Sequence, residues 1–200
     1  MRALSYLIIG LTILAVLGDV AAILSVDNYS PVRDTISELA AVDGSRFEDP
    51  AILALALALF LTMVLLAVRK GGGAKWLTGL GFLLLCSIVV ALMALWNAYD
   101  APGGAMREGS FALSAHRKLV WILGGAFFGA ATLLADRLKA IGAPWREKAS
   151  LGLAFLWLVT APIFFFVDTG IDGAYERGLA LIVIAWLWIA ATASADRRVT

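Results

Sequence analysis

Six long apolar stretches, separated by short polar segments, run from one end of the chain to the other. Their approximate bounds are Leu4–Ser25, Ala51–Val68, Trp76–Trp96, Arg117–Leu138, Ala149–Val167 and Ala174–Ala193. Each is close to the roughly 20 residues that an α-helix needs to cross about 30 Å of hydrocarbon. These stretches lack the two-residue alternation of a barrel strand. The pattern predicts an all-α polytopic membrane protein, a six-transmembrane-helix bundle in a single integral membrane domain over residues 1–200.

The composition supports a lipid environment. Of the 200 residues, 62% are hydrophobic and only 16% are charged, with a mean hydropathy of +0.90. A soluble domain is about half apolar and about a quarter charged, so the apolar excess exceeds what one buried core absorbs. A single histidine argues against a metal site built from several imidazoles. The formal net charge of +1 indicates neither an acidic nor a basic partner. We expect no metal, no cofactor and no nucleic-acid partner.

Lys and Arg are distributed unevenly between the two sets of loops. Ten of the sixteen lie in the N-terminal stub, the second and fourth loops and the C-terminal tail, whereas the opposite side has six bases and eleven acids. Because cytoplasmic loops are enriched in Lys and Arg, both termini are predicted to be cytoplasmic in a cell inner (plasma) membrane. A cleavable leader ending near Ala22 fits poorly, since Asp19 precedes that site.

The longest outer connection, residues 26–50, contains a predicted helix. Ser30 followed by Pro31 is typical of a helix start, with a side-chain cap and then a residue that lacks an N–H. The apolar positions Val32, Ile36 and Leu39 then share one helical face, opposite Arg33, Asp34, Ser37 and Glu38. We expect a short amphipathic helix at the outer face, either a solvated cap or a lid that closes a pocket.

Asp19 is the least expected residue of the first apolar stretch. It lies four to six residues from the outer end, roughly 6–9 Å deep at about 1.5 Å per residue. An ionisable group there costs at least a few kcal/mol unless it is paired or hydrated. Candidate partners are Arg177, Arg117 and His116, so Asp19 is either half of a structural ion pair or a functional group.

Most other distinctive polar residues occur where the spans meet the outer side. The candidate catalytic residues are Glu38, His116, Asp19 and Asp168. The candidate binding residues are Ser30, Arg33, Ser37, Glu38, Asn97, His116, Glu176 and Arg177. Ser37, His116 and Asp168 contain the atoms of a nucleophile, a base and an orienting group, but no motif or spacing supports a triad. We predict that Glu38, His116 and Arg177 lie in one connected outer cluster.

The fourth span contains two glycines, Gly125 and Gly129, four residues apart. This spacing permits close packing of membrane helices. It predicts a tight contact either within the bundle or with another membrane protein subunit.

The motif Tyr29-Ser30-Pro31 followed by Ile36-Ser37-Glu38-Leu39, together with His116 and Glu176-Arg177, resembles domain-of-unknown-function family 998. The resemblance covers nearly the whole chain and implies a six-helix membrane protein of bacteria or archaea, without an established reaction. The chain departs from the family pattern at Ala40, where the family usually has Gly. It also departs at residues 97–100, where the family often has a Pro-Cys-Asp or Pro-Thr-Asp segment.

Three functions fit these observations. A non-catalytic membrane component, such as an accessory subunit, scaffold or sensor, is favoured by the short loops and few titratable groups. An enzyme or binding protein acting on lipid head groups at the outer leaflet requires an outward cavity with polar groups in hydrogen-bond reach. A small transporter ranks last, because the helix centres are almost wholly apolar. The expected partners are membrane lipids.

Overall fold

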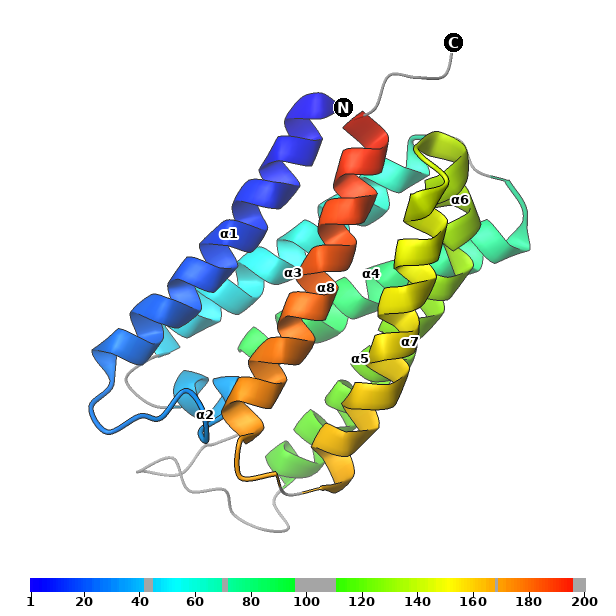
Figure 1. Cartoon of the computed structure of the whole chain (residues 1–200). Helices are drawn as coiled ribbons and strands as arrows, with labels where there is room; N and C mark the ends of the chain where they lie inside the picture. Colours follow the sequence, from blue (N-terminus) through cyan, green and yellow to red (C-terminus); the bar gives the residue numbers. More distant parts are fainter. Residues whose placement is uncertain (42–44, 70–71, 96–110, 168, 196–200) are drawn as a thin grey trace.

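The computed structural model describes the chain except for residues 42–44, 70–71, 96–110, 168 and 196–200. The described residues form eight helices and no strand (Figure 1): α1 Arg2–Ser25, α2 Ile36–Ala40, α3 Ser45–Ala67, α4 Ala74–Leu95, α5 Phe111–Leu133, α6 Ala135–Ile141, α7 Trp145–Phe166 and α8 Asp172–Ala195. Five of them are long and apolar enough to cross a membrane, and the bent pair α5–α6 supplies a sixth candidate span. The prediction of an all-α multi-pass membrane protein is confirmed.

The long helices form a closed ring. Each span packs on the next one along the chain, in the order α1, α3, α4, α5, α7 and α8, and α8 returns to pack on α1. Small residues allow close approach: a Cβ added at Gly18 of α1 would lie 2.6 Å from Cβ of Ala51 in α3. Small side chains at such contacts are typical of membrane helices, whose association relies on close packing.

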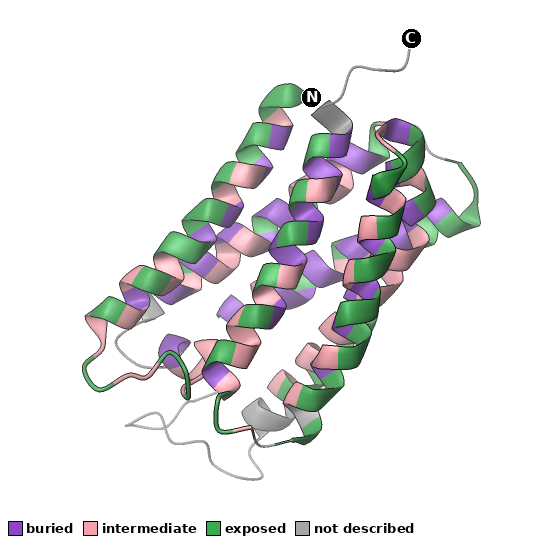
Figure 2. Cartoon of the chain, viewed as in Figure 1, coloured by how far each residue is buried: buried purple, intermediate pink, exposed green. Residues whose placement is uncertain are grey.

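The outside of the ring is apolar. Figure 2 shows exposed residues facing outward along the long helices and buried residues facing the interior. The exposed side chains include many large hydrophobic ones on α1 and α7, such as Leu7, Leu17, Phe155 and Leu158, which are 50%, 59%, 66% and 49% exposed. Water would disfavour so much apolar surface, whereas lipid tails accommodate it. The ring is therefore covered by side chains suited to lipid.

Polar side chains inside the ring hydrogen-bond to neighbouring helices. The Ser5 hydroxyl of α1 donates to the carbonyl of Ala191 in α8 at 2.8 Å, and the Ser87 hydroxyl of α4 donates to the carbonyl of Ala56 in α3 at 2.9 Å. Such bonds satisfy groups that lipid cannot hydrate. The Ser5 contact also shows that α1 begins and α8 ends at the same end of the bundle, away from α2 (Figure 1).

The predicted fourth span, Arg117–Leu138, is not one straight helix. It breaks at Leu134, and α6 leaves the direction of α5 by 42°. Charged residues account for the change of direction: Asp136 pairs with Lys75, and the Arg137 guanidinium donates to the carbonyl of Arg69 at 2.7 Å. These contacts tie α6 to the connection between α3 and α4 instead of extending α5.

The predicted outer helix exists, but its expected start at Ser30 and Pro31 is wrong. Residues 31–34 form turns, and α2 has only five residues. The Asp34 carboxylate accepts the Ser30 N–H at 2.6 Å, which stabilises the turn, and Thr35 is the actual N-cap of α2. Val32, expected on the buried face, is 49% exposed.

Candidate functional site

Arg177, in the first turns of α8, organises the end of the bundle that carries α2, which the charge distribution predicts to be the outer end. Its guanidinium pairs with Asp19 of α1, donating from Nε to Oδ2 at 3.0 Å and from Nη2 to Oδ1 at 2.9 Å. Its Nη1 also donates to three carbonyl oxygens, those of Pro31 at 3.1 Å, Asp34 at 3.2 Å and Gly173 at 3.1 Å. Its Nη2 donates to the Tyr29 hydroxyl at 2.9 Å. One side chain thus joins α1, α8 and the loop before α2.

Tyr29 completes this attachment. Its hydroxyl proton lies between the carbonyl oxygens of Asp34 and Thr35, at 2.7 and 2.8 Å, while its oxygen accepts from Arg177. Burial raises the pKa of Tyr29 above its ordinary value, so the phenol stays neutral and keeps its donor. The preceding Asn28 has a φ of 62°, a left-handed conformation that asparagine tolerates.

A backbone contact brings the same loop against α8. Gly173 and Ala174 donate their N–H groups to the carbonyls of Arg33 and Val32, at 3.2 and 3.0 Å. These donors belong to the first turn of α8, which has no partners for them inside the helix. A Cβ at Gly173 would lie 2.1 Å from the carbonyl oxygen of Asp34, so only glycine allows this approach.

Helix α2 is fixed by two carboxylates. Thr35 and Glu38 form a capping box, in which the Glu38 carboxylate accepts from the Thr35 N–H at 2.6 Å and the Thr35 hydroxyl accepts from the Glu38 N–H at 3.2 Å. The Glu176 carboxylate of α8 accepts from the Ile36 N–H at 2.6 Å. Leu39 and Ala40 of α2 are buried, and α2 lies at the end of the bundle away from the two chain termini (Figure 1).

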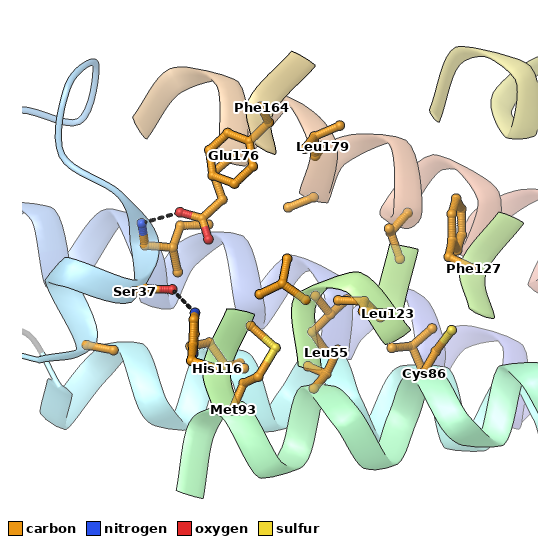
Figure 3. A pocket seen from close by; sticks show the side chains of 18 of the residues that line it. Ser37, Leu55, Cys86, Met93, His116, Leu123, Phe127, Phe164, Glu176 and Leu179 are labelled. Carbon is orange, nitrogen blue, oxygen red and sulfur yellow. Dashed lines mark hydrogen bonds between the residues drawn. The ribbon is translucent and has the colours of Figure 1, made fainter. Parts of the chain in front are cut away.

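A narrow cavity of about 150 Å³ extends from α2 into the ring. Its outer end contains Ser37, Asp49, His116 and Glu176, whereas most of its wall is apolar. Figure 3 shows Ser37, His116 and Glu176 at one end of the cavity and Cys86 and Phe127 at the other. His116 and Phe127 are eleven residues apart on α5, a separation of about 16 Å at about 1.5 Å per residue. We call this space the central cavity.

Two of the predicted site residues meet at the mouth of the central cavity. The Ser37 hydroxyl oxygen and Nε2 of His116 lie 3.1 Å apart, at hydrogen-bond distance (Figure 3). Either atom can donate, depending on which ring nitrogen carries the proton. The pair joins α2 to the start of α5. Helix α2 lines the mouth of the central cavity, and we call it the lid. The lid is therefore held by α5 as well as by α8.

A second cavity, of about 240 Å³, lies between α1, α3 and α8, and we call it the lateral cavity. Its charged lining residues are Asp19, Glu48 and Arg177. Glu48, in the first turn of α3, is 2% exposed, and its Oε2 has no hydrogen-bond partner among the described residues. Four residues border both cavities: Ile36, Ile52, Leu55 and Ala180.

The structure separates the predicted site residues into groups. Ser37, His116 and Glu176 line the central cavity, and Asp19 and Arg177 line the lateral one. Glu38, His116 and Arg177 are linked through α2 and its loop, although they do not share one cavity. Asn97 and Asp168 lie outside the described residues.

Three predicted site residues have local roles instead. The Glu38 carboxylate is used by the capping box and does not line either cavity. The Ser30 hydroxyl oxygen accepts from the N–H of Arg33 at 3.4 Å in a tight turn. The Arg33 side chain is exposed, and its carbonyl rather than its charge contacts α8.

Sequence reasoning missed Tyr29, Glu48, Asp49 and Gly173 as site residues. Glu48 and Asp49 precede the expected second span, and α3 begins before them, at Ser45, which places both carboxylates within the helix. Pro50 gave a misleading signal, because a proline is typical of the first turn of a helix and so suggests that the helix begins after Glu48. In α3 it lies inside the helix.

The family assignment can now be set beside this geometry. A family described as a protein of unknown function, DUF998, matches residues 8–193. The chain belongs to the DUF998 family. The match includes every helix from α2 to α7 and most of α1 and α8, so this DUF998 chain carries its outer site within the family region. No curated protein matches, and no solved structure matches.

Among the described residues there is no group of three or more His, Cys, Asp or Glu side chains arranged to hold a metal ion. The arrangement offers an apolar cavity with a hydroxyl, an imidazole and two carboxylates at its mouth. Groups of these kinds donate and accept hydrogen bonds.

Proposed function

We propose that this protein is a non-catalytic component of a cell inner membrane that holds the alkyl chain of an amphiphile in its central cavity. The observation that carries the proposal is the polarity of that cavity: a polar mouth formed by Ser37, His116 and Glu176, and an apolar lining that follows α5 from His116 to Phe127, a rise of about 16 Å. Half of a hydrocarbon core of about 30 Å has a similar thickness. The cavity therefore suits one chain of one leaflet.

The distribution of charge supports an outward-facing mouth. Lys75, Arg137 and Lys139 lie around α6, at the end of the bundle where α1 begins and α8 ends. Basic residues favour the cytoplasmic side, so we assign both termini to the cytoplasm and the mouth with α2 to the outer leaflet. This orientation is part of the proposal.

Selectivity is expected to come from the mouth. An alkyl chain that enters the cavity from a bilayer leaves surroundings as apolar as those it enters, so apolar burial alone contributes little net affinity. Hydrogen bonds to Ser37, His116 or Glu176 distinguish one head group from another. An occupied cavity would then make α2 respond to ligand, which is the behaviour of a sensor or accessory subunit.

A photoreactive ligand tests the proposal. The full chain, in vesicles of neutral lipid, is irradiated with a monoacylglycerol that carries a diazirine at the end of its chain, and labelled residues are mapped by mass spectrometry. Labelling near Cys86, Phe127 or Trp157, the inner end of the cavity, is expected. Labels found only on lipid-facing residues such as Phe155 would contradict the proposal.

A second function is favoured by the distance of 3.1 Å between the Ser37 hydroxyl and His116 Nε2. In an ester hydrolase the hydroxyl oxygen attacks the carbonyl carbon while the imidazole takes its proton and then returns it to the leaving alkoxide. Water then hydrolyses the resulting ester of Ser37. In that case the central cavity would hold the acyl chain of the substrate.

An active-site probe separates the two functions. A fluorophosphonate reacts with an activated serine, so a hydrolase is expected to be labelled at Ser37, with labelling lost in both Ser37→Ala and His116→Ala. A non-catalytic protein shows no labelling in the wild type while it still takes up the diazirine probe. The second result is the one that our proposal predicts.

A further inference from the structure

The lateral cavity opens toward lipid. Two of its lining residues, Val16 of α1 and Leu181 of α8, are 41% and 56% exposed on the outer surface of the bundle. Apart from Asp19, Glu48 and Arg177, the lining residues are apolar. A molecule can therefore enter between α1 and α8 from the side and reach charged groups at the inner end.

Arg177 and Asp19 are already occupied by each other. Their two-point contact pairs one positive with one negative charge, and the remaining N–H groups of Arg177 point to three carbonyl oxygens and Tyr29. A guanidinium has five N–H donors, all of which have partners in this arrangement. Arg177 has no donor left for a phosphate or carboxylate ligand.

Glu48, unlike Arg177, has a polar atom without a hydrogen-bond partner among the described residues. Glu48 is 2% exposed and lines the lateral cavity, and that atom is its Oε2. A buried polar atom without a partner costs free energy, and a buried charge costs more unless a counter-charge is near. With Asp19 and Arg177 paired to each other, Glu48 is the carboxyl group of the cavity that a cationic ligand can ionise and pair with.

We propose that the lateral cavity binds the ammonium group of an organic amine, with Glu48 as its counter-ion. An ammonium supplies the missing donor and also the counter-charge that makes an ionised Glu48 favourable, and its alkyl substituent fits the apolar walls that lead past Val16 and Leu181. A divalent metal fits less well, since hard cations take six or more oxygen ligands and only one carboxylate here is unengaged. The amine is either a small free molecule or the head of an amphiphile.

Matched ligands test this site. The purified full chain, in a neutral maltoside detergent, is titrated with octylammonium, octanol and octanoate, and binding is followed calorimetrically; ethylammonium is a fourth ligand without a long chain. Octylammonium is expected to bind at least tenfold more tightly than octanol or octanoate. Binding of ethylammonium as well indicates a free amine, and a requirement for the octyl chain indicates an amphiphile.

Two variants connect the binding to this cavity. Glu48→Gln is expected to weaken octylammonium binding tenfold or more, whereas Glu147→Gln, the same change at the other end of the bundle, leaves it unchanged. Val16→Trp fills the opening without changing a charge and is expected to block binding, which keeps the test valid even if Glu48→Gln fails to fold. Three results overturn the proposal. The first is equal affinity for the three octyl ligands, and the second is no binding of either amine. The third is an octylammonium affinity equal to that of the wild type in both Glu48→Gln and Val16→Trp.

Discussion

Arg177 and Asp19 form an ion pair that joins the last membrane helix to the first. Two N–H groups of the guanidinium contact the two carboxylate oxygens, and the side chains are only 17% and 18% exposed. The same guanidinium holds the loop before α2 through carbonyl oxygens. One side chain therefore contributes both to closure of the helix ring, beside the Ser5 contact with α8, and to placement of α2 over the central cavity.

Arg177→Lys is expected to lower the free energy of unfolding by roughly 2–4 kcal/mol. A lysine keeps the charge but cannot make the planar, two-point contact, and breaking a mostly buried pair is costly. Thermal unfolding in detergent measures the loss. Asp136→Asn is the control, because its pair with Lys75 is well exposed and is worth less than about 1 kcal/mol. Equal stability of Arg177→Lys and the wild type would argue against the proposed role of the pair.

Gly173→Ala is expected to detach the loop at residues 31–34 from α8. The new Cβ would overlap the carbonyl oxygen of Asp34, and the two backbone hydrogen bonds from Gly173 and Ala174 would be lost. We expect a loss of about 2–3 kcal/mol, since overpacking and lost hydrogen bonds act together. Gly178→Ala, on the same helix with open space around it, should be neutral or slightly stabilising. Similar unfolding temperatures for the two variants would contradict the prediction.

Glu176→Ala is expected to loosen α2 without unfolding the bundle. The Ile36 N–H loses its acceptor, and the lid keeps only its capping box and the contact between Ser37 and His116. Hydrogen exchange should become faster at Ile36–Ala40 and stay unchanged in α4. Glu176→Gln retains an acceptor oxygen and should preserve most of the protection. Unchanged exchange in Glu176→Ala would show that Glu176 does not hold the lid.

The two glycines of α5 are expected to behave differently. A Cβ at Gly129 would lie 2.7 Å from the ring of Phe82 in α4, whereas Gly125 is exposed with open space around it. Gly129→Leu should therefore destabilise the monomer by about 1–3 kcal/mol, and Gly125→Leu should leave the unfolding temperature unchanged. If a partner subunit packs on α5, Gly125→Leu should instead reduce the amount of that subunit that co-purifies with the chain, or the mass of the oligomer measured in detergent.

The sequence was sufficient for the parts of the fold that depend on local composition. The six apolar stretches, the difference in charge between the two sides and the need of Asp19 for a partner follow from what lipid excludes; which of Arg177, Arg117 and His116 is that partner did not. The break at Leu134 was not predictable in this way. It depends on contacts of Asp136 and Arg137 with residues more than 60 positions away.

The candidate site was predicted only in outline for a similar reason. His116 and Ser37 could be assigned to the outer end from their positions, but their contact depends on how α2 is seated by Glu176 and Arg177. Glu38 was expected to face a ligand, yet a backbone N–H three residues away is its nearer partner. Glu48 gave no signal because its burial follows from helix packing rather than from its neighbours in sequence.

Occupation of the central cavity can be tested most directly by comparing two neighbouring positions of α5. Leu123 lines the cavity, and Ile122 is 44% exposed to the outside. Photolabelling by the diazirine monoacylglycerol is measured for Leu123→Trp and Ile122→Trp in the same neutral vesicles. The proposed function predicts that Leu123→Trp loses labelling at the inner end of the cavity while Ile122→Trp retains it. Undiminished labelling of Leu123→Trp at those residues would contradict it.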